Sequence, residues 1–206
     1  MELERKVVFL DRDRTINVQR HDEENDRRNY VLEWEDFEFI PYSDSAIRYL
    51  LENGYVVVVV SNQACVGKGY CTKEDMSAIF GRMWVDIDPP IGSKYHTYAC
   101  PHIKKDDCVC RKPKPGLMYA AAFQEGLCLK EAWMVGDSRD DMRAGWAATI
   151  RKLILINPEV PVLEPGPKER RVAQPTVAPS LAIAAAYIVG IDEKQGVFNE
   201  DKEENI

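Results

Sequence analysis

The chain has 206 residues, of which 45% are hydrophobic and 30% are charged, and its formal net charge is −7. This composition is typical of one globular domain with a short extension. The negative balance argues against nucleic acids as partners, because their binding depends on Lys and Arg neutralising phosphates. The longest apolar run, residues 181–191, falls short of the ~20 residues that cross a membrane. The charged N-terminus lacks a signal-peptide pattern, so we expect a cytoplasmic protein. We also expect that it is a monomer and that it does not bind membranes.

Short apolar runs alternate with segments of helical periodicity along most of the chain. Runs rich in β-branched residues predict buried strands at residues 7–10, 55–60, 133–135 and 153–156. Apolar residues at helical spacing predict helices that begin at Ser43, Thr72, Gly116 and Asp140. Strands that alternate with helices form right-handed βαβ units. We therefore expect an α/β fold, a Rossmann-like parallel sheet with helices on both faces.

Three segments lie outside this alternation. Residues 22–28 are almost all charged and are expected to form a solvated loop. Residues 158–179 are rich in proline and predict an irregular excursion, after which residues 181–191 form a last helix or strand. We expect one domain over residues 1–192 and an acidic tail over residues 193–206, frayed from Asn199 onward.

Polar residues follow three of the predicted strands. Asp11 and Asp13 follow the first, Ser61 follows the second, and Asp137 and Asp141 follow the strand at residues 133–135. Because the carboxyl ends of parallel strands meet at one edge of a sheet, we expect these side chains to converge. Crowded carboxylates repel one another unless a cation lies among them, and a set of oxygen ligands suits Mg²⁺. The sequence therefore predicts a magnesium site at this edge.

A second metal site is predicted within a loop at residues 98–112. Its four soft ligands are Cys100, His102, Cys108 and Cys110. A Cys-x-His pair and a Cys-x-Cys pair so close together suit tetrahedral Zn²⁺. Because four protein ligands leave no open position on the ion, we expect a structural zinc that holds the loop. The remaining cysteines have no such grouping. We expect Cys128 in the core, and Cys65 and Cys71 as incidental loop residues.

The order of these motifs resembles the haloacid dehalogenase superfamily over residues 5–157. The matching residues are Asp11-x-Asp13-x-Thr15, Ser61, Lys112-Pro113 and Gly136-Asp137-x-x-x-Asp141. The resemblance implies that Asp11 attacks phosphorus and forms an aspartyl-phosphate. It implies that Asp13 is the acid and base, Ser61 hydrogen-bonds the phosphoryl group and Lys112 neutralises it. Asp11, Asp13 and Asp137 would hold Mg²⁺ with support from Asp141. We expect the anionic neighbours of Asp13 to raise its pKa, as an acid requires.

The zinc loop and the Arg111-Lys112-Pro113 run that follows it narrow the resemblance. They are similar to the D-glycero-D-manno-heptose 1,7-bisphosphate phosphatases and the bacterial histidinol-phosphate phosphatases, which lack a large cap domain. The resemblance implies a small phosphorylated metabolite as substrate, with a sugar bisphosphate ahead of histidinol phosphate. It also implies five substrate-binding residues: Asn17, Asn62, Gln63, Lys68 and Arg111.

The sequence departs from this branch at two places. Arg14 stands where the branch has glycine, and Ala64-Cys65 replaces Ser-Gly. Either Arg14 is strained at positive φ, or its backbone is ordinary and its guanidinium reaches a second phosphate; we expect the second. The departures leave a non-catalytic, zinc-stabilised binding protein as an alternative function. A nucleic-acid end-processing phosphatase is disfavoured, because the chain lacks a groove of basic and aromatic residues.

Overall fold

The computed structural model describes residues 6–156 and 175–203, with side chains described as far as residue 194. In these ranges six parallel strands form one sheet in the order β3-β2-β1-β4-β5-β6. The strands are β1 (Val7–Leu10), β2 (Val56–Asn62), β3 (Tyr95–Cys100), β4 (Trp133–Gly136), β5 (Lys152–Ile156) and β6 (Thr176–Ala178). The order reverses beside β1, so β1 and its neighbours β2 and β4 lie at the centre of the sheet.

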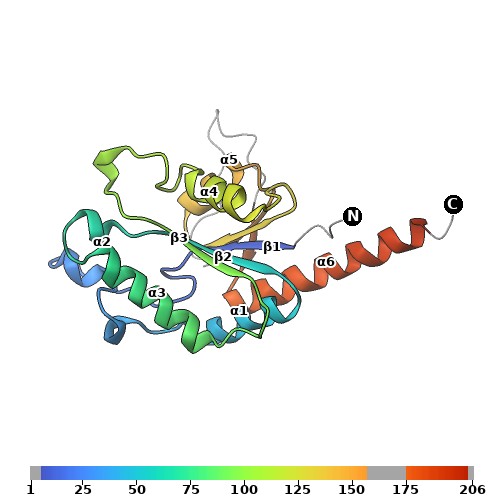
Figure 1. Ribbon diagram of the computed structural model, residues 1–206, viewed down its shortest axis with the longest axis horizontal. Coiled ribbons are helices and arrows are strands. Elements are labelled where there is room, and N and C mark those ends of the chain that lie inside the picture. The colour runs from blue at the N-terminus through green and yellow to red at the C-terminus, as the bar shows by residue number, and fades with distance from the viewer. Residues whose placement is uncertain (1–5, 157–174, 204–206) are drawn as a thin grey trace.

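Helices cover both faces of the sheet, as the sequence predicted (Figure 1). Their bounds are α1 (Ser43–Glu52), α2 (Ala64–Gly67), α3 (Lys73–Ile87), α4 (Gly116–Glu125), α5 (Arg139–Ala147) and α6 (Leu181–Glu203). Helices α1, α3 and α6 pack on one face, and α4 and α5 pack on the other. This three-layer arrangement confirms the Rossmann-like fold class. None of the helices in the described ranges is long and apolar enough to span a membrane.

Strand β2 shows why the sheet lies at the centre of the molecule. Its residues Val56 to Val60 are all buried, and they alternate between the two layers of the core. Val57 and Val59 pack with α1 and α3, whereas Val56, Val58 and Val60 pack with α4. Each buried Val side chain contributes roughly 1.5–3 kcal/mol of transfer free energy, so this run fixes the middle of the sheet.

Helix starts are specified by side-chain caps. Thr72 accepts the backbone N–H of Asp75 and Asp75 accepts that of Thr72, which forms the capping box of α3. Ser138 and Asp141 form the same reciprocal box at α5. The second box lies directly after β4 and fixes the orientation of Asp141, a residue of the candidate site.

The structure differs from the sequence-based expectations at the edges of the sheet. Strand β3 was not predicted, because its Tyr and Thr side chains are half exposed and give no continuous apolar run. Residues 181–191 form a helix, and this helix continues to Glu203 through most of the segment expected to be a tail. Most of the expected proline-rich excursion, residues 157–174, lies outside the described residues, as do residues 204–206.

Candidate active site and metal centres

Three carboxylates gather where β1 and β4 end. The backbone N–H of Asp11 donates to the carbonyl of Val135 at 2.9 Å, so the two strand ends lie side by side. One carboxylate oxygen from each of Asp11, Asp137 and Asp141 lies within 4.8 Å of the other two, and all three residues are buried. A Cβ at Gly136 would approach Asp141 to 2.6 Å, so only glycine lets Asp141 reach this cluster. The predicted convergence of these three residues is observed.

Lys112 is the cation of this cluster. Its Nζ forms ion pairs with Asp11 and, at 2.6 Å, with Asp141 Oδ1, and it donates to the Val60 carbonyl at 2.7 Å. Only 3% of the side chain is exposed. The backbone of Lys112 is held by the Asn62 side chain, whose Oδ1 accepts its N–H at 3.0 Å and whose Nδ2 donates to its carbonyl at 3.1 Å. Asn62, at the end of strand β2, therefore fixes the position of Lys112, which lies fifty residues further along the chain.

The pKa values of Asp11 and Asp137 are raised by their surroundings. Burial raises the pKa of Asp11 well above its ordinary value, with further contributions from Asp141, Asp13 and Asp137, although Lys112 opposes the shift. Burial also raises the pKa of Asp137 to about 6. Burial is the largest cause of both shifts, whereas Lys112 and, at Asp137, also Arg14 oppose them. The oxygen-only ligand set of three buried carboxylates fits a divalent magnesium ion.

Asp13 lies beside this cluster, with its carboxylate directed elsewhere. Its Oδ1 accepts from Arg12 Nη2 at 2.6 Å and from Asn17 Nδ2 at 3.2 Å, and its Oδ2 accepts from Gln63 Nε2 at 2.9 Å. Burial alone would raise the pKa of Asp13, but the Arg12 guanidinium and these hydrogen bonds outweigh it and hold the pKa below its ordinary value. The expectation of a raised pKa was therefore wrong for the metal-free protein.

Arg12 is a site residue that the sequence analysis missed. Its side chain is 1% exposed and contacts Asp13 on one side, with Met76 Sδ at 3.3 Å and the Phe80 ring at 5.1 Å on the other. The sequence feature that could have identified Arg12 is its position between Asp11 and Asp13, the two aspartates of the first motif. A buried arginine requires paired acceptors, and Asp13 provides them.

Arg14 has a left-handed backbone, with φ of 62°. We expected an ordinary φ, and this expectation was wrong. We also expected the guanidinium to reach a second phosphate, and this stays a prediction. In the structure the guanidinium Nε pairs with Asp137 Oδ2 at 2.7 Å. The chain reverses here in a tight turn in which the Arg14 N–H donates to the Asn17 carbonyl at 2.8 Å, and this turn sets the φ.

The residues expected to bind substrate do not all face solvent. Asn17 and Gln63 are buried and hydrogen-bond Asp13, and Gln63 Nε2 also donates to Ser61 Oγ at 2.7 Å. Lys68 Nζ forms an ion pair with Asp26 Oδ2 at 2.7 Å, and Arg111 Nη1 donates to the His102 carbonyl at 3.1 Å. Asn17, Gln63 and Asn62 thus support Asp13, Ser61 and Lys112. Arg111 remains partly exposed and forms no ion pair within the described part of the chain.

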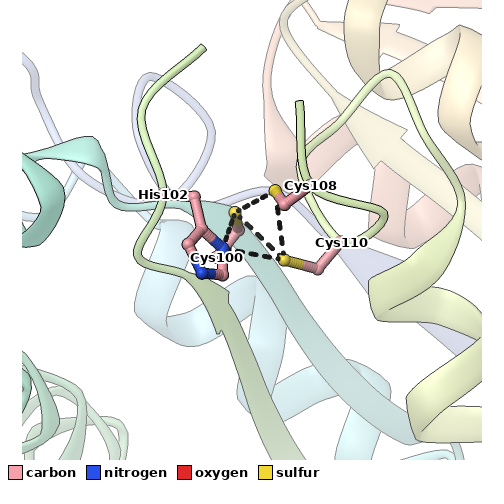
Figure 2. A group of neighbouring side chains, drawn as sticks. All are labelled: Cys100, His102, Cys108 and Cys110. Carbon is pink, nitrogen blue, oxygen red and sulfur yellow. Dashed lines mark hydrogen bonds between the residues drawn. The ribbon is translucent and has the colours of Figure 1, made fainter. Parts of the chain in front are cut away.

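The four expected zinc ligands converge at the end of β3 (Figure 2). Cys110 Sγ lies 3.3 Å from both Cys100 Sγ and His102 Nδ1, and 3.4 Å from Cys108 Sγ. Cys100 Sγ lies 3.6 Å from Cys108 Sγ. Ligands about 2.3 Å from a zinc ion at tetrahedral angles are about 3.8 Å apart, so the observed separations fit a tetrahedral Zn²⁺.

The other three cysteines correct the expectations made for them. Cys128 is exposed, although it was expected in the core. Cys65 is wholly buried in the core beneath α2, although it was expected to be an incidental loop residue. Cys71 is partly buried against the same core. The two core positions follow from the fold of residues 64–71, which local periodicity does not reveal.

Comparisons with known proteins agree with this geometry. Residues 109–157 match a family model described as HAD-hydrolase-like. A D-glycero-beta-D-manno-heptose-1,7-bisphosphate 7-phosphatase of Helicobacter pylori is 32% identical over 152 residues, which cover 73% of this chain and 83% of that protein. The protein with this name from Pasteurella multocida is 32% identical and covers 84% of this chain and 94% of its own length. A D-glycero-alpha-D-manno-heptose-1,7-bisphosphate 7-phosphatase of Campylobacter jejuni is 35% identical, covering 75% and 84%.

Solved structures share the fold. A D,D-heptose 1,7-bisphosphate phosphatase of B. bronchiseptica, complexed with magnesium and phosphate, aligns with a TM-score of 0.72 at 24% identity and covers 90% of this chain and 98% of its own. A protein of the same name from Burkholderia thailandensis aligns with a TM-score of 0.59 at 22% identity, covering 90% and 99%.

The parallel sheet, the carboxylates at its carboxyl edge and these matches together define a phosphoric monoester hydrolase of the haloacid dehalogenase type. The chain belongs to the haloacid dehalogenase superfamily and, within it, to the family of the heptose 1,7-bisphosphate 7-phosphatases. The resemblance found in the motifs is thereby confirmed.

Proposed function

We propose that this phosphatase removes the 7-phosphate from a D-glycero-D-manno-heptose 1,7-bisphosphate with the help of Mg²⁺. The observation that carries the proposal is the buried pairing of Lys112 with Asp11 inside the carboxylate cluster. A carboxylate nucleophile repels a phosphate dianion unless cations neutralise both. Lys112 is one such cation. Asp11 and Asp137 would hold the other, Mg²⁺, which supplies Lewis-acid polarisation of the phosphoryl oxygens when bound.

The chemistry would use two carboxylates in turn. An Asp11 oxygen attacks phosphorus, the P–O bond to the sugar breaks, and the leaving oxygen takes a proton from Asp13. Water then attacks the aspartyl-phosphate while Asp13 accepts its proton, which releases inorganic phosphate and restores Asp11. Arg12 keeps Asp13 ionised in the free protein. The bound phosphate dianion would raise the pKa of Asp13 and favour its protonated form.

Three further residues would complete the phosphate site. Ser61 would hydrogen-bond the phosphoryl group, with its hydroxyl oriented by Gln63. Arg111, which has no carboxylate partner in the described ranges, would bind the sugar or its second phosphate. Asp141 would hold Lys112 in place, since its Oδ1 pairs with Lys112 and its Oδ2 accepts from Ser138.

The alternative of histidinol phosphate draws less support from the charged loop before α1. Recognition of its ammonium would need a free carboxylate, and two of the four in this loop are occupied, because Asp26 pairs with Lys68 and Asp22 pairs with Arg28. Glu23 and Glu24 are exposed and form no ion pair in the described ranges. The pair with Asp26 removes Lys68 from the set of free cations, so the preference for a bisphosphate depends on Arg111 and on the names of the relatives. The relatives include both beta and alpha anomers, and the proposal covers either.

The proposal extends to the setting of the enzyme. No disulfide joins any of the six cysteines, which is usual in a reducing cytosol and supports a cytoplasmic location. The enzyme would be a monomer with a structural zinc. Residues 1–192 would form the phosphatase domain.

A substrate comparison tests the function. We expect kcat/KM for heptose 1,7-bisphosphate to exceed that for histidinol phosphate by roughly 100-fold, because the charged contact of Arg111 with the second phosphate, worth about 1–3 kcal/mol, is lost with the smaller substrate. Asp11→Asn should lower kcat by at least about 10⁴-fold while the unfolding midpoint stays near that of the wild type. A preference for histidinol phosphate would reverse the substrate assignment, and a fully active Asp11→Asn protein would overturn the mechanism.

A further inference from the structure

Strand β3 forms one end of the sheet, and half of its backbone groups point away from the sheet (Figure 1). Toward β2, the Lys94 carbonyl accepts the Val57 N–H at 3.1 Å. Bonding residues alternate along a regular parallel ladder, so every second residue from Lys94 to Cys100 bonds β2. The residues between them direct their N–H and C=O groups outward, where no other described backbone group bonds them: Tyr95, Thr97 and Ala99.

This outward edge of β3 lacks the features that usually protect an edge strand. Soluble proteins block such strands with a proline, a lysine on the strand, a bulge or a covering segment. The six residues of β3 include neither proline nor lysine, and the strand pairs with β2 in unbroken register. The edge is therefore a template to which a further strand can bond.

A groove of about 560 Å³ lies between this edge and helix α3. Phe80 and Trp84 form its apolar wall, and Trp84 is held in place because its indole N–H donates to Thr97 Oγ1 at 2.9 Å. At Gly81, which also lines the groove, an added Cβ would meet no atom within 4 Å. The groove thus offers space, an apolar surface and free backbone groups, which together suit one extended chain segment.

The free charges of the groove are positive. The rings of Trp84 and Tyr95 lie 4.4 Å apart between centroids, so Lys73, about three helical turns before Trp84, lies at the opposite end of the groove. Lys73 and Lys94 are exposed, and neither forms an ion pair within the described ranges. None of the described residues that line the groove is a carboxylate. An acidic segment therefore complements its charge.

We propose that this groove binds an extended acidic segment of a partner protein, which joins the sheet as a further strand beside β3. The backbone of the segment bonds the outward groups of β3, and every second side chain covers Phe80 and Trp84. Its carboxylates meet Lys73 at one end. A second copy of this chain fits less well, because two such edges bring like charges together. The site is separate from the carboxylate cluster and does not depend on the proposed phosphatase function.

A peptide selection tests the site in the zinc-loaded full-length protein. Random dodecapeptides displayed on phage are selected on the wild type after depletion on Ala99→Pro. Proline at this position removes an outward N–H and no bond to β2, so it blocks the edge and keeps the sheet. We expect enriched acidic peptides that bind the wild type and the matched control Ala99→Ser at least roughly 10-fold more tightly than Ala99→Pro. No enrichment, enrichment of basic peptides, or equal affinity for the three proteins would overturn the proposal.

Amide exchange measured by NMR on the wild type locates the selected peptide without depending on how a variant folds. With saturating peptide, we expect exchange of the Tyr95, Thr97 and Ala99 N–H groups to slow by at least roughly 10-fold, because they become hydrogen-bonded. The N–H groups of His96 and Tyr98 already bond β2 and should change less. Unchanged exchange at the three outward groups places the peptide elsewhere and removes the proposal.

Charge reversal tests the acidic character of the partner. Lys73→Glu should weaken binding of the selected peptide by roughly fivefold, because attraction becomes repulsion. Lys130→Glu is the matched control, since it changes the net charge equally at an exposed position outside the groove, and it should leave the affinity within twofold. Equal weakening in both variants would show that only the net charge matters and would contradict the assignment.

Sedimentation of the peptide-free protein tests the other occupant of the edge. We expect the wild type and Ala99→Pro to sediment alike as monomers. A wild-type dimer that Ala99→Pro dissociates would assign the edge to a second copy of this chain and overturn the partner proposed here.

Discussion

Asp137 carries its charge at a cost in the metal-free protein, because burial raises the pKa of its carboxyl to about 6 from an ordinary value of 3.8. Between these values the native state binds a proton that the unfolded state has released. Stability therefore falls as pH rises through this window, and the loss is complete above pH 6. Asparagine at this position has no charge to bury and does not titrate.

We expect Asp137→Asn to raise the free energy of unfolding of the Mg²⁺-free protein by about 1–3 kcal/mol at pH 7. The gain should shrink as the pH is lowered from 6 to 4.5, because wild-type Asp137 then becomes neutral too. Urea unfolding in Mg²⁺-free buffer across this range measures the difference. The same variant should lose Mg²⁺-dependent activity. A constant difference across the pH range would show that Asp137 titrates normally.

Arg14 combines a backbone cost with a charge benefit. A side chain at a φ of 62° costs about 1 kcal/mol or more relative to glycine. Its ion pair with Asp137 offsets little of this, because 59% of the Arg14 side chain is exposed and the pair is screened by solvent. The guanidinium also pairs with Asp137, one of the carboxylates that would hold Mg²⁺.

We expect Arg14→Gly to raise the unfolding free energy by about 1 kcal/mol with Mg²⁺ present and to lower the Kd for Mg²⁺ severalfold. Arg14→Ala is the matched control, since it removes the same guanidinium but keeps a Cβ at positive φ. It should bind Mg²⁺ more tightly without the gain in stability. Thermal unfolding and calorimetric Mg²⁺ titration separate the two effects. Weaker Mg²⁺ binding in both variants would mean that Arg14 supports the metal site.

The residues also show where sequence reasoning reaches its limit. Strand ends predicted that Asp11, Asp13, Ser61, Asp137 and Asp141 converge, and Asp11, Asp137 and Asp141 form one cluster. The role of Lys112 was implied by the family resemblance alone. The pairing of Arg12 with Asp13 and the φ of Arg14 were not predicted, since burial of a charge and left-handed backbone depend on the folded turn. Asn17 and Gln63 were expected to bind substrate, and they are buried and hydrogen-bond Asp13.

At the scale of elements, the zinc loop links β3 to Lys112, the residue proposed to neutralise phosphate. Its four ligands lie between the end of β3 and Arg111, and Lys112 follows directly. Gly67 of α2 packs against this loop so closely that a Cβ there would lie 2.7 Å from the Pro101 carbonyl. Loss of zinc should therefore loosen both the loop and the position of Lys112.

We expect Cys110→Ser to reduce bound zinc from about one ion per chain to nearly none, and to lower kcat by roughly 10- to 100-fold. Cys128→Ser should keep both, because Cys128 is exposed and lies outside the cluster. Elemental analysis and steady-state kinetics on the same preparations provide the readouts. Fully active wild type that carries no zinc when freshly purified would contradict the role given to this loop.

The elements that sequence analysis predicted are those with continuous apolar patterns. Strands β1, β2, β4 and β5 and helices α1, α3, α4 and α5 were all found, and their bounds agree within a few residues. Strands β3 and β6 were missed because both lie at the ends of the sheet and expose part of their side chains. An edge strand needs only one apolar face, so a short one gives little periodic signal.

At the scale of the whole molecule, α6 packs along one face of the sheet and reaches the amino-terminal edge of the sheet at Asp192. Five of its apolar residues are buried: Leu181, Ala184, Ala185, Ile188 and Val189. At the end of this packed stretch, Asp192 Oδ2 accepts from Tyr55 Oη at 2.8 Å and from Trp133 Nε1 at 3.1 Å. Its Oδ1 accepts from Lys152 Nζ at 3.2 Å. Asp192 thus joins α6 to three other parts of the domain.

This anchor leads to a prediction about the domain boundary, which we place at residue 192. A chain of residues 1–194 keeps Asp192 and removes only the acidic segment beyond it. We expect it to retain kcat within twofold and to change the unfolding free energy by less than about 1 kcal/mol, because exposed helix ends fray at little cost. Asp192→Ala in the full chain is the matched comparison. It removes the carboxylate that accepts from the Tyr55 hydroxyl, the Trp133 indole N–H and the Lys152 ammonium, and it should lower stability by about 1–3 kcal/mol. Urea unfolding with parallel activity assays measures both. If the truncated chain loses more stability than Asp192→Ala, residues 195–206 belong to the folded domain and the boundary must move toward the C-terminus.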